Sequence, residues 1–140
     1  MMKTMTKRFV FDTCFMIYLS QPQAVIAAEA RQALETDEAE HFVSAISAWE
    51  IGLLVAKGRL NLTRSPIDWF GNFVDEKGIA VLAASPSILV ASSFLPSPIH
   101  ADPADRILVA TARENDLTLI TRDRAILAYG AAGHVKVLAC

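Results

Sequence analysis

The chain has 140 residues, of which 53% are apolar, and its formal net charge is −2. This size fits a single domain over residues 1–140, and the weak negative charge argues against a broadly basic nucleic-acid-binding surface. Two cysteines are too few for a disulfide framework, and no apolar run reaches the roughly 18 residues of a membrane span. Because the sequence also shows no signal-peptide pattern, we expect a cytoplasmic protein.

The first predicted elements are a strand and two helices. The apolar run at residues 8–11 is typical of a buried strand. Thr13 is expected to cap a short helix that ends at residue 19. Pro22 is expected to open a second helix over residues 23–35, because apolar side chains recur there at helical spacing.

The middle of the chain is predicted to contain a second strand and two more helices. The strand is expected at residues 41–44. Ser47 and Glu50 form a Ser-x-x-Glu capping box, which predicts a helix that starts at Ser47 and stops at Gly58. A further helix is predicted over residues 65–78, between a serine cap and a terminal glycine.

The remaining elements alternate between strands and helices. Pro103 is expected to open a helix and Thr121 to cap another. In chain order, we expect a strand at 79–82, a helix at 85–94, a proline-containing loop at 95–102, a helix at 104–117, a strand at 117–120, a helix at 123–129 and a strand at 135–138.

This alternation predicts the fold class. Short apolar strands separated by helices indicate an α/β fold with a mostly parallel sheet and helices on both faces. In such folds, ligands bind beyond the carboxyl ends of the strands. Functional side chains are therefore expected just after strands, or in the first turns of the helices that follow them.

Five acidic side chains stand at such positions, and each has an ordinary structural explanation. Asp12 could cap the helix after the first strand, and Glu50 could close the capping box. Asp102 precedes a proline, which is a well-formed helix start, so we interpret it mainly as a cap. Asp105 and Asp123 suit the positive dipole end of a helix.

Four of these acids also form a pattern: Asp12, Glu50, Asp105 and Asp123. They come from separate elements that should converge on one edge of a parallel sheet, where carboxylates repel one another unless a cation lies between them. Oxygen donors without a His or Cys cluster favour Mg²⁺, with Mn²⁺ as an alternative. The pattern therefore predicts hydrolysis of a phosphodiester by metal-activated water.

Four motifs, in order along nearly the whole chain, carry a family resemblance. They read FVFDT, SAISAWEI, DPADRILVATA and LITRD. Together they make the chain resemble the PIN-domain ribonucleases, with most similarity to the VapC toxins of type II toxin–antitoxin modules.

The resemblance implies a fold, a site and partners. The fold would be a three-layer α/β/α sandwich whose sheet has the strand order 3-2-1-4-5. The four acids would bind Mg²⁺ or Mn²⁺ and position the attacking water, while Thr13, Asp102 and Thr121 would support the site. The protein would cut RNA and would be neutralised by a cognate antitoxin. It would form a homodimer, and a hetero-oligomer with that antitoxin.

The chain departs from the resemblance near the first acid. Where many relatives carry His and Trp after Asp12, this chain has Cys14 and Tyr18. Neither is an expected metal ligand, and we interpret Cys14 as an inert thiol. Details of substrate choice are not carried over. Arg106 and Arg122 each stand beside a proposed ligand, and we expect at least one of them to contact RNA phosphate.

Two other functions compete with the nuclease. A phosphatase of the haloacid dehalogenase type would use Asp12 as its nucleophile, but it needs a second Asp where Cys14 stands. A PIN-like interaction module could bind metal without cutting RNA. Metal-dependent RNA cleavage that is lost on Asp12→Asn separates the nuclease from both.

Overall fold

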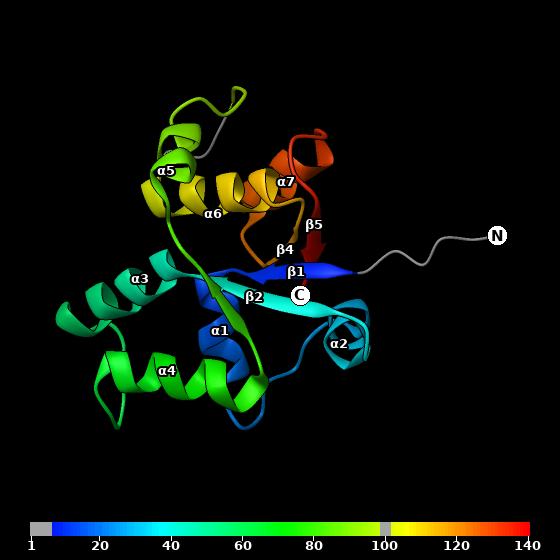
Figure 1. The fold of residues 1–140 in the computed structure, drawn as a ribbon. Helices are drawn as coiled ribbons and strands as arrows, with labels where there is room; N and C mark the ends of the chain where they lie inside the picture. The colour runs from blue at the N-terminus through cyan, green and yellow to red at the C-terminus, as the bar shows by residue number, and fades with distance from the viewer. Residues whose placement is uncertain (1–6, 99–101) are drawn as a thin grey trace.

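Five short strands form one parallel sheet through the middle of the molecule (Figure 1). The computed structural model describes residues 7–98 and 102–140. The sheet order is β3-β2-β1-β4-β5, and every neighbouring pair is parallel. The predicted α/β class and the strand order 3-2-1-4-5 are therefore confirmed. The strands are β1 (Arg8–Phe11), β2 (Glu40–Ser44), β3 (Ala80–Leu82), β4 (Thr118–Thr121) and β5 (Val137–Ala139).

Helices cover both faces of the sheet, which gives three layers (Figure 1). One face carries α1 (Thr13–Leu19), α2 (Ala28–Glu35), α3 (Ala45–Ala56) and α4 (Pro66–Lys77). The other face carries α6 (Pro103–Glu114) and α7 (Arg124–Ala131), with α5 (Pro86–Ser92) packed against α6.

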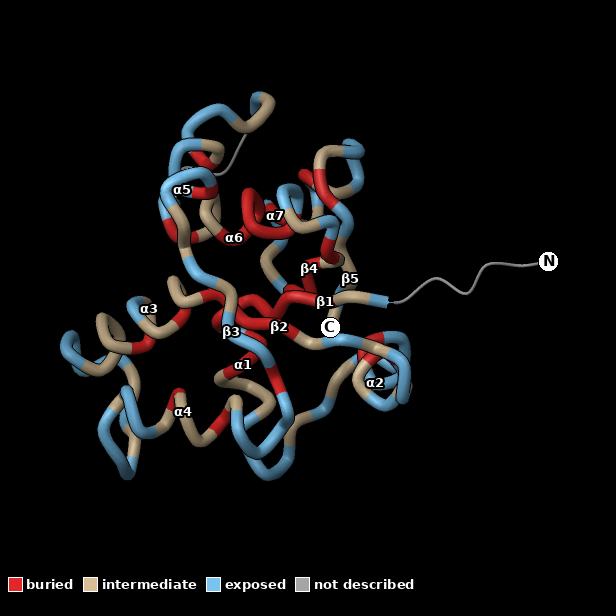
Figure 2. The backbone as a smooth tube through the Cα atoms, in the orientation of Figure 1, coloured by how far each residue is buried: buried red, intermediate tan, exposed pale blue. Residues whose placement is uncertain are grey.

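Side-chain alternation along β1 explains why two separate cores form. Phe9 and Phe11 point into the core under α1–α4, whereas Val10 points into the core under α6 and α7. In β4, Ile120 points into the core under α1–α4 and Leu119 into the core under α6 and α7. Because both faces are covered, the central strands are buried, as Figure 2 shows in red, and they read as continuous apolar runs in the sequence.

The second helix begins later than the sequence predicts. We expected it to open at Pro22, but α2 starts at Ala28. The reason lies in a tertiary contact at Val25. Its N–H donates to Tyr18 Oη at 2.7 Å and its carbonyl accepts from the same hydroxyl at 2.8 Å. Both backbone groups of Val25 are thus bound by a side chain, so they are not available to a helix.

Three predicted helix caps were wrong by one to three residues. The N-cap residues of α1, α3 and α7 are Asp12, Ser44 and Asp123, rather than Thr13, Ser47 and Thr121. Ser44 accepts from the Ile46 N–H at 3.1 Å and Asp123 accepts from the Ile126 N–H at 3.0 Å. The three displaced hydroxyls are buried instead, and they face polar partners between elements.

The other predicted helices are confirmed within a few residues. Ser65 and Ser85 cap α4 and α5 with their side chains, and Gly78 ends α4 at a φ of 63°. The strands β3, β4 and β5 each begin one or two residues later than expected. In the predicted loop at 95–102, residues 99–101 lie outside the described part of the chain.

Gly130 on α7 generates a stability prediction. A Cβ at this position would overlap the Val137 side chain and lie 3.2 Å from the Val135 carbonyl oxygen. We expect Gly130→Ala to lower the free energy of unfolding by about 1–3 kcal/mol, because α7 would have to move off β5. Urea denaturation measures this.

Gly71 in α4 is the matched control, because nothing lies within 4 Å of a Cβ built there. Gly71→Ala should raise the free energy of unfolding by about 0.5–1 kcal/mol, since alanine has the better helix propensity. Equal effects of the two substitutions would contradict the close packing of α7 on β5.

Candidate active site

Asp12 stands at the carboxyl end of the central strand and is the most buried of the acids. Its side chain is 5% exposed. Its N–H donates to the Ile120 carbonyl at 3.0 Å, which ties the end of β1 to β4. The Thr121 hydroxyl donates to Asp12 Oδ2 at 2.6 Å. Burial raises the pKa of Asp12, and repulsion from Asp123 adds to this, while the bond from Thr121 opposes it.

Thr121 links Asp12 to the next acid along the edge. Its Oγ1 accepts from the Asp123 N–H at 3.0 Å while it donates to Asp12. Asp123 caps α7 through its Oδ1, and this cap fixes the carboxylate at the start of the helix. One hydroxyl therefore holds the ends of β1 and β4 and two acids in a fixed relation.

Glu50 lies in the second turn of α3, which follows β2. Thr13 Oγ1 donates to Glu50 Oε1 at 2.5 Å and lies 2.8 Å from Ser47 Oγ. Burial raises the pKa of Glu50 first, the bond from Thr13 lowers it, and the charges of Asp12 and Asp102 raise it again. The predicted capping box is thus wrong, because Glu50 faces the other acids rather than the start of its own helix.

Asp105 shows the clearest sign of a shared site. Burial raises its pKa from 3.8 to about 7, and four neighbouring carboxylates add to the rise: Asp102, Asp12, Asp123 and Glu50. These acids come from four different parts of the chain, so the fold gathers the predicted residues at one edge. Asp102 caps α6 as expected, accepting from the Ala104 and Asp105 N–H groups at 2.8 and 3.2 Å.

Cys14 lies within reach of the same charges. Cys14 is exposed as a residue, but partial desolvation of its thiol raises the pKa to about 11, and four acids add to the rise: Asp12, Glu50, Asp105 and Asp123. A thiol with that pKa stays protonated at neutral pH and is a poor nucleophile. This agrees with the interpretation of Cys14 as an inert thiol.

The carboxylates at this edge could hold a hard divalent cation. As placed, no three Asp, Glu, His or Cys side chains of the described residues are close enough to enclose an ion. Mg²⁺ does not need such a cage, because it usually takes one or two carboxylates and completes its shell with water and substrate phosphate. Crowded oxygen donors with raised pKa values suit such an ion.

The two arginines predicted to contact RNA have different surroundings. Arg122 is exposed, and its guanidinium carbon lies 3.8 Å from the centre of the Tyr18 ring. It also donates to the Val25 carbonyl at 2.9 Å. Arg122 therefore stabilises the turn between α1 and α2 as well as standing beside Asp123. Arg106 is partly buried in the first turn of α6, directly after Asp105.

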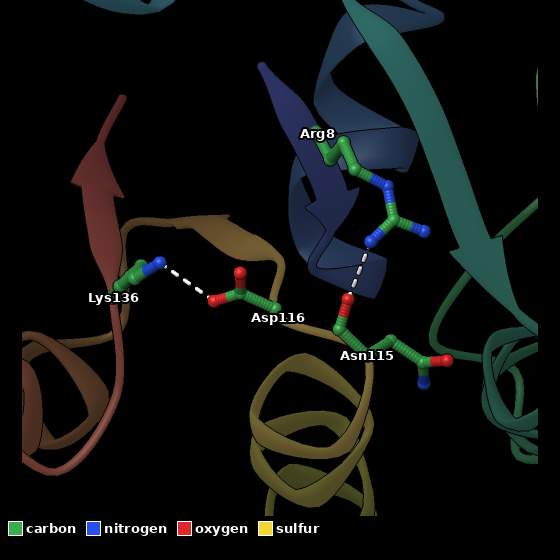
Figure 3. Close-up of polar contacts among 4 residues, drawn as sticks. All are labelled: Arg8, Asn115, Asp116 and Lys136. Carbon is green, nitrogen blue, oxygen red and sulfur yellow. Dashed lines mark hydrogen bonds and ion pairs between the residues drawn. The ribbon is translucent and has the colours of Figure 1, made fainter. Parts of the chain in front are cut away.

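At the opposite end of the sheet, near the starts of β1, β4 and β5, Figure 3 shows an ion pair and a hydrogen bond from an arginine. Lys136 Nζ lies 2.6 Å from Asp116 Oδ1, and Arg8 donates to the Asn115 carbonyl at 2.6 Å. A groove of about 840 Å³ lies there, and Asp116, Gly130, His134 and Lys136 are among its lining residues. Two acids, Glu114 and Asp116, line this groove, and Asp116 is paired with Lys136, so the groove differs from the candidate active site, where several carboxylates raise one another's pKa.

Ser47 is a site residue that the sequence analysis did not identify as one. It is buried and contacts Thr13, whereas the sequence suggested a cap. Its spacing to Glu50 could have indicated a place near the site, because residues three apart share one helix face. A capping box has the same spacing, so the sequence could not separate the two interpretations.

Comparison with known proteins gives consistent matches. A sequence model of the PIN domain family matches residues 9–131. Ribonuclease VapC22 of Mycobacterium tuberculosis (strain ATCC 25618 / H37Rv) is 32% identical over 110 residues, which cover 79% of this chain and 82% of the relative.

Solved structures show the same fold. VapBC2 from Rickettsia felis, bound to a DNA fragment from its promoter, matches with a TM-score of 0.68 and 11% identity, covering 94% of this chain and 98% of that one. FitAcB from Neisseria gonorrhoeae matches with a TM-score of 0.59 and 23% identity, covering 93% and 96%. At these identities the likeness concerns the fold alone.

The raised pKa of Asp105 predicts how metal-free stability depends on pH. Below pH about 4, Asp105 is protonated in both the folded and the unfolded state. Between pH about 4 and 7, the unfolded chain loses the proton while the folded protein keeps it, so the free energy of unfolding falls as pH rises. Above about pH 7, Asp105 is charged in both states, and the free energy of unfolding stays at its lowered value.

We therefore expect the melting temperature of chelator-treated wild type to fall relative to Asp105→Asn as pH rises through this window. Thermal unfolding of both proteins across pH 4–8 measures the difference, in which titrating groups remote from Asp105 cancel. A difference that does not change with pH would show that Asp105 has an ordinary pKa.

Proposed function

Because this chain belongs to the PIN-domain family, we propose that it is a metal-dependent endoribonuclease and the toxin of a type II toxin–antitoxin module. The observation that carries the proposal is the convergence of Asp12, Glu50 and Asp105 with Asp123 at one edge of the sheet. Their mutual repulsion calls for a cation. The name of the 32% identical relative, Ribonuclease VapC22, supports RNA as the substrate.

We assign the cation as Mg²⁺, with Mn²⁺ as an alternative. Asp12 and Asp105 would bind it directly, and Glu50 and Asp123 would bind it directly or through water. A cation bound there would neutralise charge on the scissile phosphate and would make a bound water more acidic. Thr13 and Thr121 support the site by holding Glu50 and Asp12 in place with hydrogen bonds.

The chain's own residues then orient the reacting groups. Glu50, whose carboxylate Thr13 holds near Asp12, would position the attacking water. The water oxygen forms a bond to phosphorus as the bond to the 3′-oxygen breaks. The 3′-oxygen takes up a proton, which leaves a 5′-phosphate and a 3′-hydroxyl. Arg106 and Arg122 would contact flanking phosphates, because a guanidinium offers several donors.

The partners follow from the same assignment. The matched structures include a toxin–antitoxin complex from Klebsiella pneumoniae, with a TM-score of 0.59 and 23% identity over 92% of this chain. By analogy, a cognate antitoxin would neutralise this protein, which would form a homodimer and a hetero-oligomer with the antitoxin. We assign it to the cytoplasm. In the described residues, no helix is long and apolar enough to cross a membrane.

The central experiment is cleavage of pooled cellular RNA by the purified protein without antitoxin. With Mg²⁺ or Mn²⁺ we expect cuts that leave 5′-phosphates, and none with chelator. Asp12→Asn and Asp105→Asn should each lower the cleavage rate at least about a hundredfold, because each removes a charged ligand. Both variants should stay folded, since each relieves repulsion between carboxylates.

Asp116→Asn is the matched control, because it makes the same change at the opposite edge of the sheet. Its cleavage rate should equal that of wild type. Cutting that survives both site substitutions would point to a contaminating nuclease. Absence of cutting by wild type in either metal would favour a module that binds metal without cleaving RNA.

Asp102 gives a separate prediction, because asparagine preserves a helix cap and alanine does not. Asp102→Ala should lower the free energy of unfolding by about 0.5–2 kcal/mol, whereas Asp102→Asn should leave it almost unchanged. If Asp102 acts mainly as a cap, Asp102→Asn keeps RNA cleavage within about threefold of wild type. A loss as large as that of Asp105→Asn would make Asp102 a ligand.

A further inference from the structure

Ser47 lies beneath the candidate active site and has no ordinary structural role in its helix. It is in the first turn of α3, but Ser44 caps that helix. Its side chain is fully buried, with 0% exposure, and its Oγ lies 2.8 Å from Thr13 Oγ1. A buried hydroxyl at this distance from another is hydrogen-bonded, and either of the two oxygens could supply the proton.

The next bond decides which oxygen supplies it. Thr13 Oγ1 donates to Glu50 Oε1 at 2.5 Å. A threonine hydroxyl has only one proton, so Thr13 cannot also donate to Ser47. We propose that Ser47 is a positioning residue of the candidate active site, whose hydroxyl donates to Thr13 Oγ1 and thereby keeps the single Thr13 proton directed at the Glu50 carboxylate.

This chain of hydrogen bonds links two helices through the site. Ser47 and Glu50 are three residues apart on α3, and Thr13 is the first residue of α1. Thr13 is 2% exposed, so water has little access to replace a missing donor. A hydroxyl that accepts one hydrogen bond donates a stronger one, which tightens the bond to Glu50.

The consequence for the site is a fixed carboxylate. Without Ser47, the Thr13 hydroxyl loses the partner that orients it, and the Glu50 carboxylate becomes free to turn away from the other acids. The effect on metal binding rests on the proposed function, whereas the hydrogen-bond chain itself does not. The two parts are therefore tested by separate measurements.

The first measurement is a double-mutant cycle in metal-free buffer, with urea denaturation of wild type, Ser47→Ala, Glu50→Ala and the double variant. Ser47→Ala should shift the denaturation midpoint in the wild-type background. If Ser47 acts through Thr13 on Glu50, that shift should be at least about halved in the Glu50→Ala background. Additive shifts would overturn the hydrogen-bond chain, whatever the protein does with metal.

The second measurement is direct titration with Mn²⁺, following free Mn²⁺ by electron paramagnetic resonance. Ser47→Ala should weaken Mn²⁺ binding by about three- to tenfold, which is the scale of one hydrogen bond. With RNA, kcat should fall while KM stays within about twofold, because Ser47 does not reach the substrate.

Ser44→Ala is the matched control, since it removes an equally buried serine hydroxyl from the start of the same helix. It should destabilise the fold through loss of the cap and leave Mn²⁺ affinity within about twofold of wild type. Equal Mn²⁺ affinities of the two serine variants would overturn the positioning role. If wild type binds no Mn²⁺ and cuts no RNA, the proposed function is wrong. The metal-free double-mutant cycle still tests whether Ser47 acts on Glu50 through Thr13.

Discussion

Repulsion between carboxylates at one edge of a parallel sheet is the constraint that organises this molecule. The strands β1, β2 and β4 all end there, and each delivers an acid directly or through the following helix. Burial and mutual repulsion raise the pKa values of Asp12, Glu50 and Asp105. Such an arrangement opposes folding unless something compensates it, and the chain supplies part of that compensation itself.

Buried hydroxyls supply this part of the compensation for Asp12 and Glu50. Thr121 donates to Asp12, and Thr13 donates to Glu50 with Ser47 behind it. A hydroxyl stabilises a carboxylate without neutralising it, so the negative charge stays available for an incoming ion. A paired lysine would cancel that charge, as Lys136 does for Asp116 at the opposite edge.

Much of this arrangement could be predicted, and the errors have specific physical causes. Apolar runs and proline or glycine positions located the strands and most helices, because both depend on local chemistry. The strand order came from the family resemblance, since periodicity carries no information on which strands pair. The convergence of the acids followed from the rule for parallel sheets. The errors arose at the helix expected after Pro22, where Tyr18 binds the backbone of Val25, and at three hydroxyls expected to be caps, which bind polar partners instead: Thr13, Ser47 and Thr121. The contacts of Thr13 with Ser47 and of Thr121 with Asp12 join segments that only the folded chain brings together.

The hydrogen bond between Thr121 and Asp12 spans 109 residues of sequence. The ribosome therefore adds Asp12 long before it adds Thr121 and Asp123, so the N-terminal and C-terminal parts of the site are synthesised at different times. A nascent chain that stops short of β4 leaves β1 without one of its two neighbours. The charge cluster is therefore completed only near the end of translation, and truncated products of the gene carry an incomplete set of ligands.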